Sequence, residues 1–323
     1  MAEPQFASDA DALKSLSGKY HELRTEIGKV IVGQEHVIRD LLISIFGNGH
    51  CLLVGVPGLA KTLLVNTISD ALGLSFNRIQ FTPDLMPSDI IGSEILDENR
   101  KFRFVKGPLF SNIILADEIN RTPPKTQSAL LEAMQERAVT ASGNRYELGR
   151  PFFVLATQNP IEQEGTYPLP EAQLDRFMFN IWVDYPTFEE EVSVVKQTTV
   201  DATAQVNPVI SGEEITFYQK LIRRMPIADN VVEYAVGLTA KTRPAGDRSP
   251  QMVKDFLSWG AGPRASQYLV IGAKVHAAVS GKFSPDIEDV QAVALPILRH
   301  RIVRNYKAEA EGYSIERIVQ ELL

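Results

Sequence analysis

The stretch "GVPGLAKT", Gly55–Thr62, follows the apolar run "CLLV" at 51–54 and leads into the helical pattern "KTLLVNTISDALG" at 61–73. Strand, glycine-containing loop and helix form the context of a phosphate-binding loop, in which backbone N–H groups converge on phosphates. In such a loop the lysine adds positive charge and Ser or Thr coordinates Mg²⁺, roles that Lys61 and Thr62 fill. An ordinary strand-to-helix turn is the alternative. The predicted nucleotide-binding residues of this loop are Gly55, Val56, Pro57, Gly58, Leu59, Ala60, Lys61, Thr62 and Leu63.

Ala60 departs from the usual pattern G-x-x-x-x-G-K-[ST], which has Gly at this position. Its methyl group fits if the backbone is right-handed there. We expect the methyl group to obstruct the loop if the position requires a positive φ.

The composition is that of a cytoplasmic protein with an enzyme-sized core. The chain has 323 residues, 44% of them hydrophobic, and a net charge of −7. This length predicts two domains, and the acidic balance argues against nucleic acid as a general partner. The start of the sequence has no signal-like segment and no apolar run approaches a membrane span, so we expect no membrane insertion. The single cysteine, Cys51, lies in an apolar strand and is predicted to be a core residue.

Short apolar strands alternate with helical patterns through about residue 187. Three of the five strand candidates are continuous apolar runs, which is typical of strands buried on both faces of a parallel sheet. The fold class is therefore α/β with a mostly parallel sheet. The segments 93–107 and 137–149 alternate around polar turns and are predicted β-hairpins, the second with its turn at residues 142–144. The strand candidates are "CLLVG" 51–55, "FNRIQF" 76–81, "NIILAD" 112–117, "FFVLAT" 152–157 and "FNIWVD" 179–184.

Amphipathic helices replace the strand signals in the second part of the chain. Ser211 and Glu214 have the spacing of a capping box, and Ser249-Pro250 and Ser284-Pro285 each place a cap residue before a proline suited to a first helical turn. We predict a nucleotide-binding α/β domain at 1–187, a linker at 188–207 and a small all-α lid domain at 208–323.

Polar residues follow two further strands. Asp117 is the last residue of "NIILAD", and Glu118 follows it directly. Both lie at the edge where a parallel sheet places its ligands. An aspartate there can hold the Mg²⁺ water shell, and the glutamate can act as general base toward a water; a surface pair of acids is the alternative. Asn159, after "FFVLATQ", can orient the water or touch the γ-phosphate, or it can simply form a turn with Pro160.

Two arginines are weaker candidates, because each alone is more often a surface or ion-pairing residue. Arg176 in "LPEAQLDRF" lies near a strand end, and Arg264 in "GPRASQ" starts a helix of the second domain. The basic stretch "LRHRIVRNYK", 298–307, is interpreted as a solvated face or a contact within a ring, with nucleic-acid contact as the alternative.

Taken together, these motifs resemble those of the AAA+ ATPases, and within them the MoxR group, which is related to the magnesium-chelatase motor subunit. Nearly the whole chain takes part, and the combination is highly specific. In that group Ala before the lysine is usual, so Ala60 points toward the group. "IVGQE" resembles the segment beside the adenine, "GVPGLAKT" resembles Walker A, and "LADEINRTPPKTQSALLEAMQE" resembles Walker B with its following helix. "ATQNP" resembles sensor 1, "EAQLDRF" the arginine finger and "GPRASQ" sensor 2.

The resemblance implies a P-loop AAA+ core with two hairpin inserts and a helical lid, assembled as a homo-hexamer. It implies Val32 and Gly33 beside the adenine, Arg176 acting on the neighbouring subunit's nucleotide, and Arg264 reporting nucleotide state to the lid. The expected activity is hydrolysis of Mg-ATP, with ATP and Mg²⁺ bound, coupled to remodelling or maturing a partner that has a von Willebrand factor A domain. A nucleotide-gated binding module or a DNA-directed AAA+ loader or helicase-like protein remains the alternative.

Overall fold

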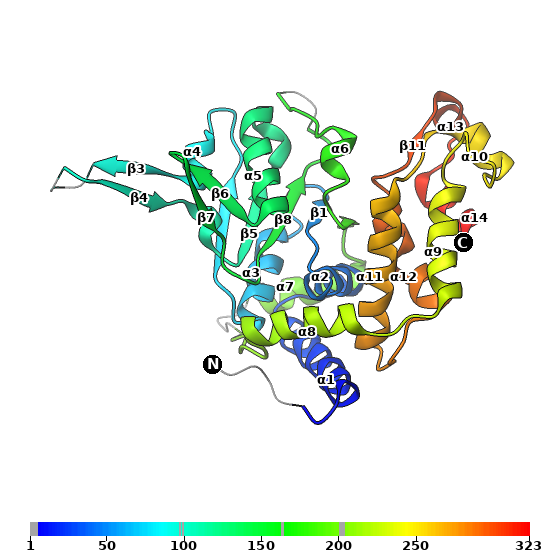
Figure 1. Cartoon of the computed structure of the whole chain (residues 1–323), viewed down its shortest axis with the longest axis horizontal. Coiled ribbons are helices and arrows are strands. Elements are labelled where there is room, and N and C mark those ends of the chain that lie inside the picture. Colours follow the sequence, from blue (N-terminus) through cyan, green and yellow to red (C-terminus); the bar gives the residue numbers. More distant parts are fainter. Residues whose placement is uncertain (1–5, 97, 99, 163–164, 200–203) are drawn as a thin grey trace.

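A five-stranded parallel sheet forms the centre of the α/β part (Figure 1). The computed structural model describes residues 6–96, 98, 100–162, 165–199 and 204–323. The strand order is β2-β5-β8-β1-β9, and each strand overlaps its predicted segment. The bounds are β1 Cys51–Val54, β2 Phe76–Gln80, β5 Ile113–Asp117, β8 Phe153–Gln158 and β9 Phe179–Trp182.

Helices cover both faces of this sheet. The helix after the predicted phosphate loop, α3, ends as expected, with Gly73 in the left-handed region (φ 58°) just beyond it. The helix α2, which precedes β1, ends with Gly47 as its C-cap residue. The helices of this part are α1 Asp9–Ile27, α2 Glu35–Phe46, α3 Lys61–Ala71, α4 Pro87–Ile91, α5 Pro124–Glu136 and α6 Glu171–Leu174, with 3-10 turns at Pro108–Phe110 and Ile119–Arg121.

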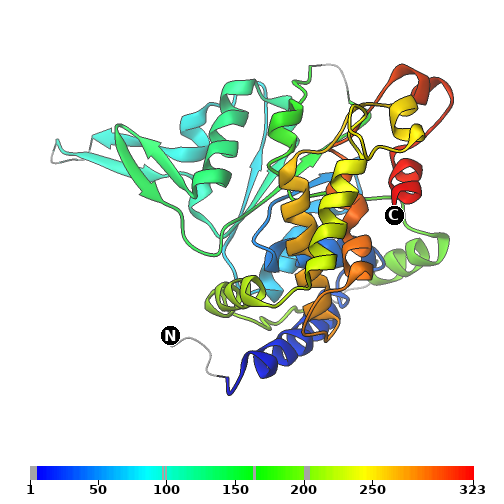
Figure 2. The ribbon, with the colours of Figure 1, turned by 45° about the vertical axis from the view of Figure 1, so that its right-hand side comes forward.

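Both predicted hairpins are present. β3 (Gly92–Leu96) pairs antiparallel with β4 (Phe102–Lys106), and β6 (Ala138–Ala141) pairs with β7 (Asn144–Glu147). The second hairpin turns on Ser142 and Gly143, both with positive φ, as its tight connection requires. Part of the first turn, residues 97 and 99, lies outside the described residues. Both hairpins extend away from the helices of the second part (Figures 1 and 2).

The second part of the chain is helical apart from one short antiparallel pair of strands. Most of the stretch predicted as a linker forms α7, whose Thr187 and Glu190 make a capping box; residues 200–203 of that stretch lie outside the described residues, and the predicted domain division stays a prediction. The bounds are α7 Phe188–Thr198, α8 Gly212–Arg224, α9 Asp229–Lys241, α10 Gln251–Phe256, α11 Pro263–Val279, α12 Ile287–Leu298, α13 Tyr306–Ala310 and α14 Ile315–Leu322, with β10 Leu257–Trp259 and β11 Val303–Arg304.

One of the three predicted helix starts in this part is confirmed and two are wrong. The Ser211–Glu214 capping box begins α8. By contrast, the Ser249 and Ser284 hydroxyls donate to backbone carbonyls of other segments, and the prolines that follow them precede the helices instead of entering the first turn. Asp286 caps α12 because its carboxylate accepts from the backbone N–H of Asp289.

The apolar core follows from the alternation of side chains along the central strands. Cys51 and Leu53 of β1 belong to the cluster on one face, while Leu52 and Val54 belong to the cluster on the other. The first cluster continues into α11 and α12, so the helical part packs on the same side of the sheet as α1 and α2. In the described ranges no helix combines the length and apolarity that crossing a membrane would need.

Cys51 is a core residue, as predicted, and its neighbour His50 is also structural. The Cys51 thiol donates to the Ser44 hydroxyl (2.8 Å), and burial raises its pKa to about 12. His50 accepts from the Val154 backbone N–H (2.9 Å) through Nδ1 and contacts the Met134 carbonyl through Nε2. Burial lowers the pKa of His50 to about 4, so the ring is neutral.

Candidate functional site

The strand register places the predicted site residues at one edge of the sheet. Gln80 of β2 stands beside Asp117 of β5, and Val54 of β1 stands beside Gln158 of β8. Because all five strands are parallel, their carboxyl ends meet at this edge, which is where open α/β sheets bind ligands. The phosphate-loop segment leaves β1 at the same edge.

The loop between β1 and α3 is shaped by two left-handed residues. Gly58 has φ 86° and Ala60 has φ 53°. They turn the chain so that α3 begins at Lys61, and its first-turn N–H groups, which no helix can satisfy internally, face the end of the sheet.

Ala60 corrects one expectation. The position does require a positive φ, yet the alanine adopts it and the loop is formed. A Cβ in the left-handed region costs about 1–2 kcal/mol, which a well-packed surrounding can sustain. The methyl group is thus a source of strain and does not obstruct the loop.

The Lys61 side chain folds over the loop. Its ammonium donates to the carbonyls of Gly55 (2.5 Å) and Val56 (3.1 Å). Burial lowers the pKa of this ammonium, and the carboxylates of Asp117 and Glu118 oppose that shift. A phosphate brought to the loop would meet a cation that is partly desolvated and held by neutral carbonyl acceptors.

Asp117 is fixed from both sides. Thr157, at the end of β8, donates its hydroxyl to Oδ1 (2.5 Å), and Arg78 of β2 donates two N–H groups to Oδ2 (3.0 and 2.6 Å). These contacts set the orientation of the carboxylate, so its position does not depend on its own rotamer preference.

Glu118 has a left-handed backbone (φ 56°) directly after β5. Its backbone N–H donates to the Thr157 hydroxyl (2.9 Å). Its Oε2 accepts from Gln80 Nε2 (2.7 Å) and Arg121 Nη1 (3.0 Å). The carboxylate is therefore restrained through one of its two oxygens. Left-handed non-glycine residues gather at functional sites, where surrounding contacts sustain the strain.

Asn159 forms the turn that the sequence offered as one of two roles, and it also lies at the cavity. Its Oδ1 accepts from the Ile161 backbone N–H (3.1 Å), which forms the turn at Pro160. Asn159 also lines the cavity between the loop and the sheet. With the oxygen engaged in the turn, the amide can offer N–H donors to a bound anion.

These residues surround one cavity of about 370 Å³. Its lining brings together Lys61, Thr62, Asp117, Glu118 and Asn159, the core of the predicted site. Val32 and Gly33 do not line it; they lie on the neighbouring loop, where Gly33 (φ 66°) leaves room for Glu190 and Gln34 contacts the carbonyl of Leu59. The cavity is lined by Pro57, Gly58, Leu59, Ala60, Lys61, Thr62, Arg78, Asp117, Glu118, Thr157 and Asn159.

The donors of this cavity fit a polyphosphate and a magnesium ion. The helix N-terminus and Lys61 suit phosphate oxygens. The Thr62 hydroxyl and the Asp117 carboxylate are hard oxygen ligands of the kind that Mg²⁺ prefers.

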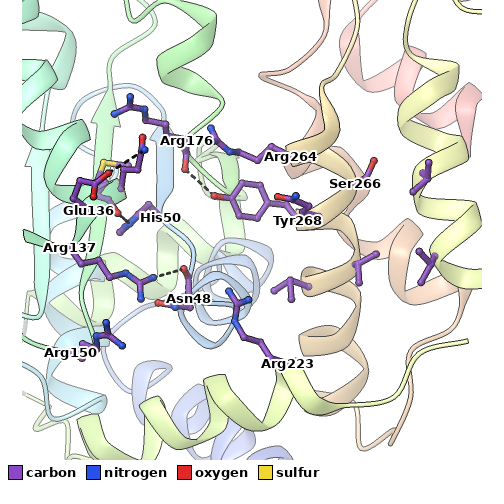
Figure 3. Close-up of a pocket in the computed structure, with 18 residues that line it drawn as sticks. Asn48, His50, Glu136, Arg137, Arg150, Arg176, Arg223, Arg264, Ser266 and Tyr268 are labelled. Atoms are coloured by element: carbon purple, nitrogen blue, oxygen red, sulfur yellow. Dashed lines mark hydrogen bonds between the residues drawn. The ribbon is translucent and has the colours of Figure 1, made fainter. Parts of the chain in front are cut away.

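Arg176 and Arg264 lie elsewhere in the same chain. Both line a second cavity of about 920 Å³ between the sheet and the helical part (Figure 3). Arg176 donates to the Leu131 carbonyl (2.8 Å), and Arg264, at the start of α11, pairs with Asp175 (3.0 Å). Neither lines the cavity of its own phosphate loop.

Residues of the helical part hold the segment that carries Arg176. Arg301, only 6% exposed, donates to the Asp175 carboxylate (2.8 Å) and to the carbonyls of Phe177 (2.6 Å) and Met178 (3.2 Å). Tyr268 donates its hydroxyl to the Arg176 carbonyl (3.3 Å). The interpretation of 298–307 as a solvated face is wrong for Arg301, whose side chain is buried because it satisfies these carbonyls.

The sequence did not single out Arg78, Gln80 or Thr157 as site residues. A signal for the first two was present: Arg78 and Gln80 are polar residues two apart near the end of a strand, so they share one face and reach the sheet edge. Which carboxylates they would meet depended on the order of the strands.

Comparisons with known proteins agree with this geometry. Residues 50–179 match the family described as "ATPase family associated with various cellular activities (AAA)", and residues 250–322 match "AAA lid domain". "Chaperone MoxR1" of Mycobacterium tuberculosis is 40% identical over 326 residues, covering 100% of this chain and 86% of the relative. "Uncharacterized protein YeaC" of Bacillus subtilis is 42% identical, covering 96% of this chain and 94% of the relative.

A solved structure also matches. The crystal structure of a candidate ATPase from Cytophaga hutchinsonii has a TM-score of 0.90 and 44% identity, covering 97% of this chain and 95% of that one. The motifs, the strand order, the sheet-edge cavity and these relatives lead to one conclusion: the chain belongs to the MoxR-type AAA+ ATPases.

Proposed function

We propose that this protein hydrolyses ATP with Mg²⁺ at the sheet-edge cavity and uses the turnover to remodel or mature a protein partner. The observation that carries the proposal is the convergence of Lys61, Thr62, Asp117, Glu118 and Asn159 on one cavity at the carboxyl ends of β1, β5 and β8. The membership of the chain in an ATPase family supports it.

In the proposed mechanism Lys61 exchanges its loop carbonyls for phosphate oxygens, since a charge-assisted bond to an anion is stronger than a bond to a neutral acceptor. Thr62 and Asp117 would hold Mg²⁺, which neutralises phosphate charge when bound. Glu118 takes a proton from the attacking water, and Asn159 donates to that water or to the γ-phosphate.

Glu118 must reach the water while Gln80 and Arg121 donate to its Oε2. Its other oxygen, Oε1, is the atom that this arrangement leaves to accept the proton. The two donors fix the orientation of the carboxylate, which suits a general base.

The absence of Arg176 and Arg264 from the cavity of their own chain supports a second part of the proposal. A γ-phosphate in transfer needs a further cation, and an arginine from a neighbouring subunit can supply it. We therefore propose a ring, a hexamer by resemblance to the group, in which these two arginines act on the next subunit's nucleotide.

The partner is proposed on resemblance alone. It is a protein with a von Willebrand factor A domain, which this chain would bind in the cytoplasm. The name of the Mycobacterium tuberculosis relative, a chaperone, is consistent with remodelling. ATPase activity stimulated by DNA would favour the alternative of a DNA-directed machine.

Replacing Glu118 by Gln tests the chemistry. The amide keeps the shape and removes the base, so we expect turnover to fall by about 10²–10⁴ with ATP binding retained. Lys61→Ala should instead weaken binding of ATP itself, measured by calorimetry. Phosphate release by the Glu118→Gln protein within a few-fold of the parent would make Glu118 a structural acid. The same variant, trapped with ATP, should retain its partner in co-purification.

A further inference from the structure

A second group of arginines lies in the cavity between the sheet and the helical part, apart from Arg176 and Arg264. Arg137 follows α5, Arg150 precedes β8, and Arg223 is in the last turn of α8. In Figure 3 these three surround Asn48, while Arg176 and Arg264 lie together near Tyr268. The three come from separate segments, so only the tertiary structure brings them together.

The three arginines line a small side pocket of about 160 Å³, which shares them and Asn48 with the large cavity. We call it the arginine pocket. None of the described residues that line it is Asp or Glu. Its lining is Asn48, Arg137, Arg150, Pro151, Phe152, Thr216, Gln219, Lys220 and Arg223.

The three arginines concentrate positive charge in this pocket. Arg264 pairs with Asp175 in the large cavity, but in the described part of the chain no ion pair joins Arg137, Arg150 or Arg223 to an acid. Burial lowers the pKa of Arg137, and the charges of Arg150 and Arg223 lower it further. Arg137 is partly buried, whereas Arg150 and Arg223 are exposed. Like charges this close repel one another, and an anion among them would relieve the repulsion.

Helix dipoles explain only part of the arrangement. Arg137 and Arg223 stand at the carboxyl ends of α5 and α8, where cations are favourable. Arg150 is in a loop and gains nothing from a helix end. Glu136, the acid that lines the large cavity, accepts from its neighbour Gln135 and does not line the arginine pocket.

The size and donors of the pocket define the ligand. A volume of about 160 Å³ corresponds to a few water molecules at about 30 Å³ each, which suits a small oxyanion and not a whole nucleotide. Guanidinium groups match phosphate oxygens through two parallel hydrogen bonds. We propose that the arginine pocket binds a phosphate-type oxyanion, supplied as free phosphate or as the terminal phosphates of a nucleotide whose remainder occupies the large cavity.

Such a ligand would connect the sheet to the helical part. Arg137 and Arg150 belong to the α/β part, while Arg223 belongs to α8, and its carbonyl accepts from Lys274 of α11 (3.3 Å). The same helix α11 begins with Arg264. An anion in the pocket therefore restrains the helix that carries Arg264, which makes the site a control point beyond the proposed hydrolytic one.

Calorimetry on the full-length Lys61→Ala protein tests this inference separately from the proposed hydrolysis. Phosphate, pyrophosphate and metal-free ATP are titrated at constant ionic strength set with chloride. We expect saturable binding that Arg150→Ala and Arg223→Ala each weaken about 10- to 100-fold, the usual effect of losing a charge-assisted bond. Arg224→Ala is the matched control, because it removes the adjacent arginine, which pairs with Asp9 at the surface, and should change nothing.

Comparison of the titrated ligands distinguishes a nucleotide from free phosphate as the source of the oxyanion. Tighter arginine-dependent binding of ATP than of pyrophosphate identifies a nucleotide as the source, and the reverse identifies free phosphate. Arg223→Gln, with its thermal midpoint measured, repeats the test if an alanine variant fails to fold. Binding that is unaffected by Arg150 and Arg223 substitutions overturns the proposal. Loss of ring assembly in these variants with unchanged phosphate binding also overturns it, because the pocket would then receive an acidic side chain of a second copy.

Discussion

Ala60 carries a left-handed backbone (φ 53°) at the start of α3, a conformation that glycine adopts without a Cβ clash. The strain at Ala60 costs about 1–2 kcal/mol. Glycine would remove that strain, but the extra conformational entropy of the unfolded chain would cost about 0.5–1 kcal/mol, which is less. We therefore expect Ala60→Gly to raise the free energy of unfolding by up to about 1 kcal/mol, measured by urea denaturation.

Ala129→Gly is the control for this prediction. Ala129 lies within the right-handed α5, where glycine should lower the free energy of unfolding by about 1 kcal/mol. If both substitutions destabilise equally, the left-handed geometry of Ala60 does not strain the loop.

The other residues of the site show the same dependence on neighbours. Asp117 and Glu118 have a recognisable sequence pattern, but their orientations come from Thr157, Arg78 and Gln80 on adjacent strands. Residue type set the chemistry that each side chain can perform, and its partners set the direction in which it points.

At the scale of elements, the connection between the helical part and the segment 175–178 has a testable consequence. Arg301 donates to the Asp175 carboxylate and to the backbone carbonyls of Asp175 and Phe177. If Arg176 acts on the neighbouring nucleotide, Arg301 is a positioning residue for it. We expect Arg301→Met to reduce kcat at least tenfold, while Mg-ATP affinity of the isolated subunit stays within a few-fold because the phosphate cavity is not touched.

Removing Arg301 leaves Asp175 paired with Arg264 alone and leaves buried carbonyls without a donor, at about 1–3 kcal/mol for each unsatisfied group. Asp175→Asn is therefore measured beside Arg301→Met, since it neutralises the pairs with Arg301 and Arg264 without removing the carbonyl donors. Arg317→Met, which removes a surface ion pair with Glu321, should leave kcat unchanged. A loss of ATP affinity as large as the loss of kcat would mean that Arg301 supports the fold generally and does not position Arg176.

At the scale of the whole molecule, the separation of the two arginines from the phosphate cavity predicts that activity depends on assembly. ATPase activity per subunit should rise with protein concentration as rings form. Arg176→Ala and Lys61→Ala proteins should each be nearly inactive. Mixed rings should recover part of the activity, because some interfaces place an intact Lys61 opposite an intact Arg176.

Native mass spectrometry establishes that the mixed rings contain both variants. Monomeric protein as active as the ring would exclude an arginine acting between subunits. Mixed rings without any recovery would mean that Arg176 acts within its own subunit or that turnover needs every site intact.

The local elements were predictable because their causes are local. The continuous apolar runs of β1, β5 and β8 indicate strands that are buried on both faces of a sheet. The Ser142-Gly143 pair indicates a tight turn. Helix starts were less secure. Ser249 and Ser284 have the side chains of caps, but their hydroxyls donate to the carbonyls of Arg243 and Pro226, and the Ser-Pro pattern does not contain that competition.

By itself the sequence determined the chemistry of the site: a lysine, a hydroxyl and two carboxylates placed after strands that had to be parallel. Only the tertiary structure decided which side chains hold them. The strand order put β2 beside β5, so Arg78 and Gln80 reach Asp117 and Glu118. It also placed Arg176 with Arg264 away from their own phosphate loop, and gathered Arg137, Arg150 and Arg223 around one pocket. Periodicity records which face of an element is buried, whereas contacts between residues far apart in the chain depend on how the elements pack, and no local pattern encodes that.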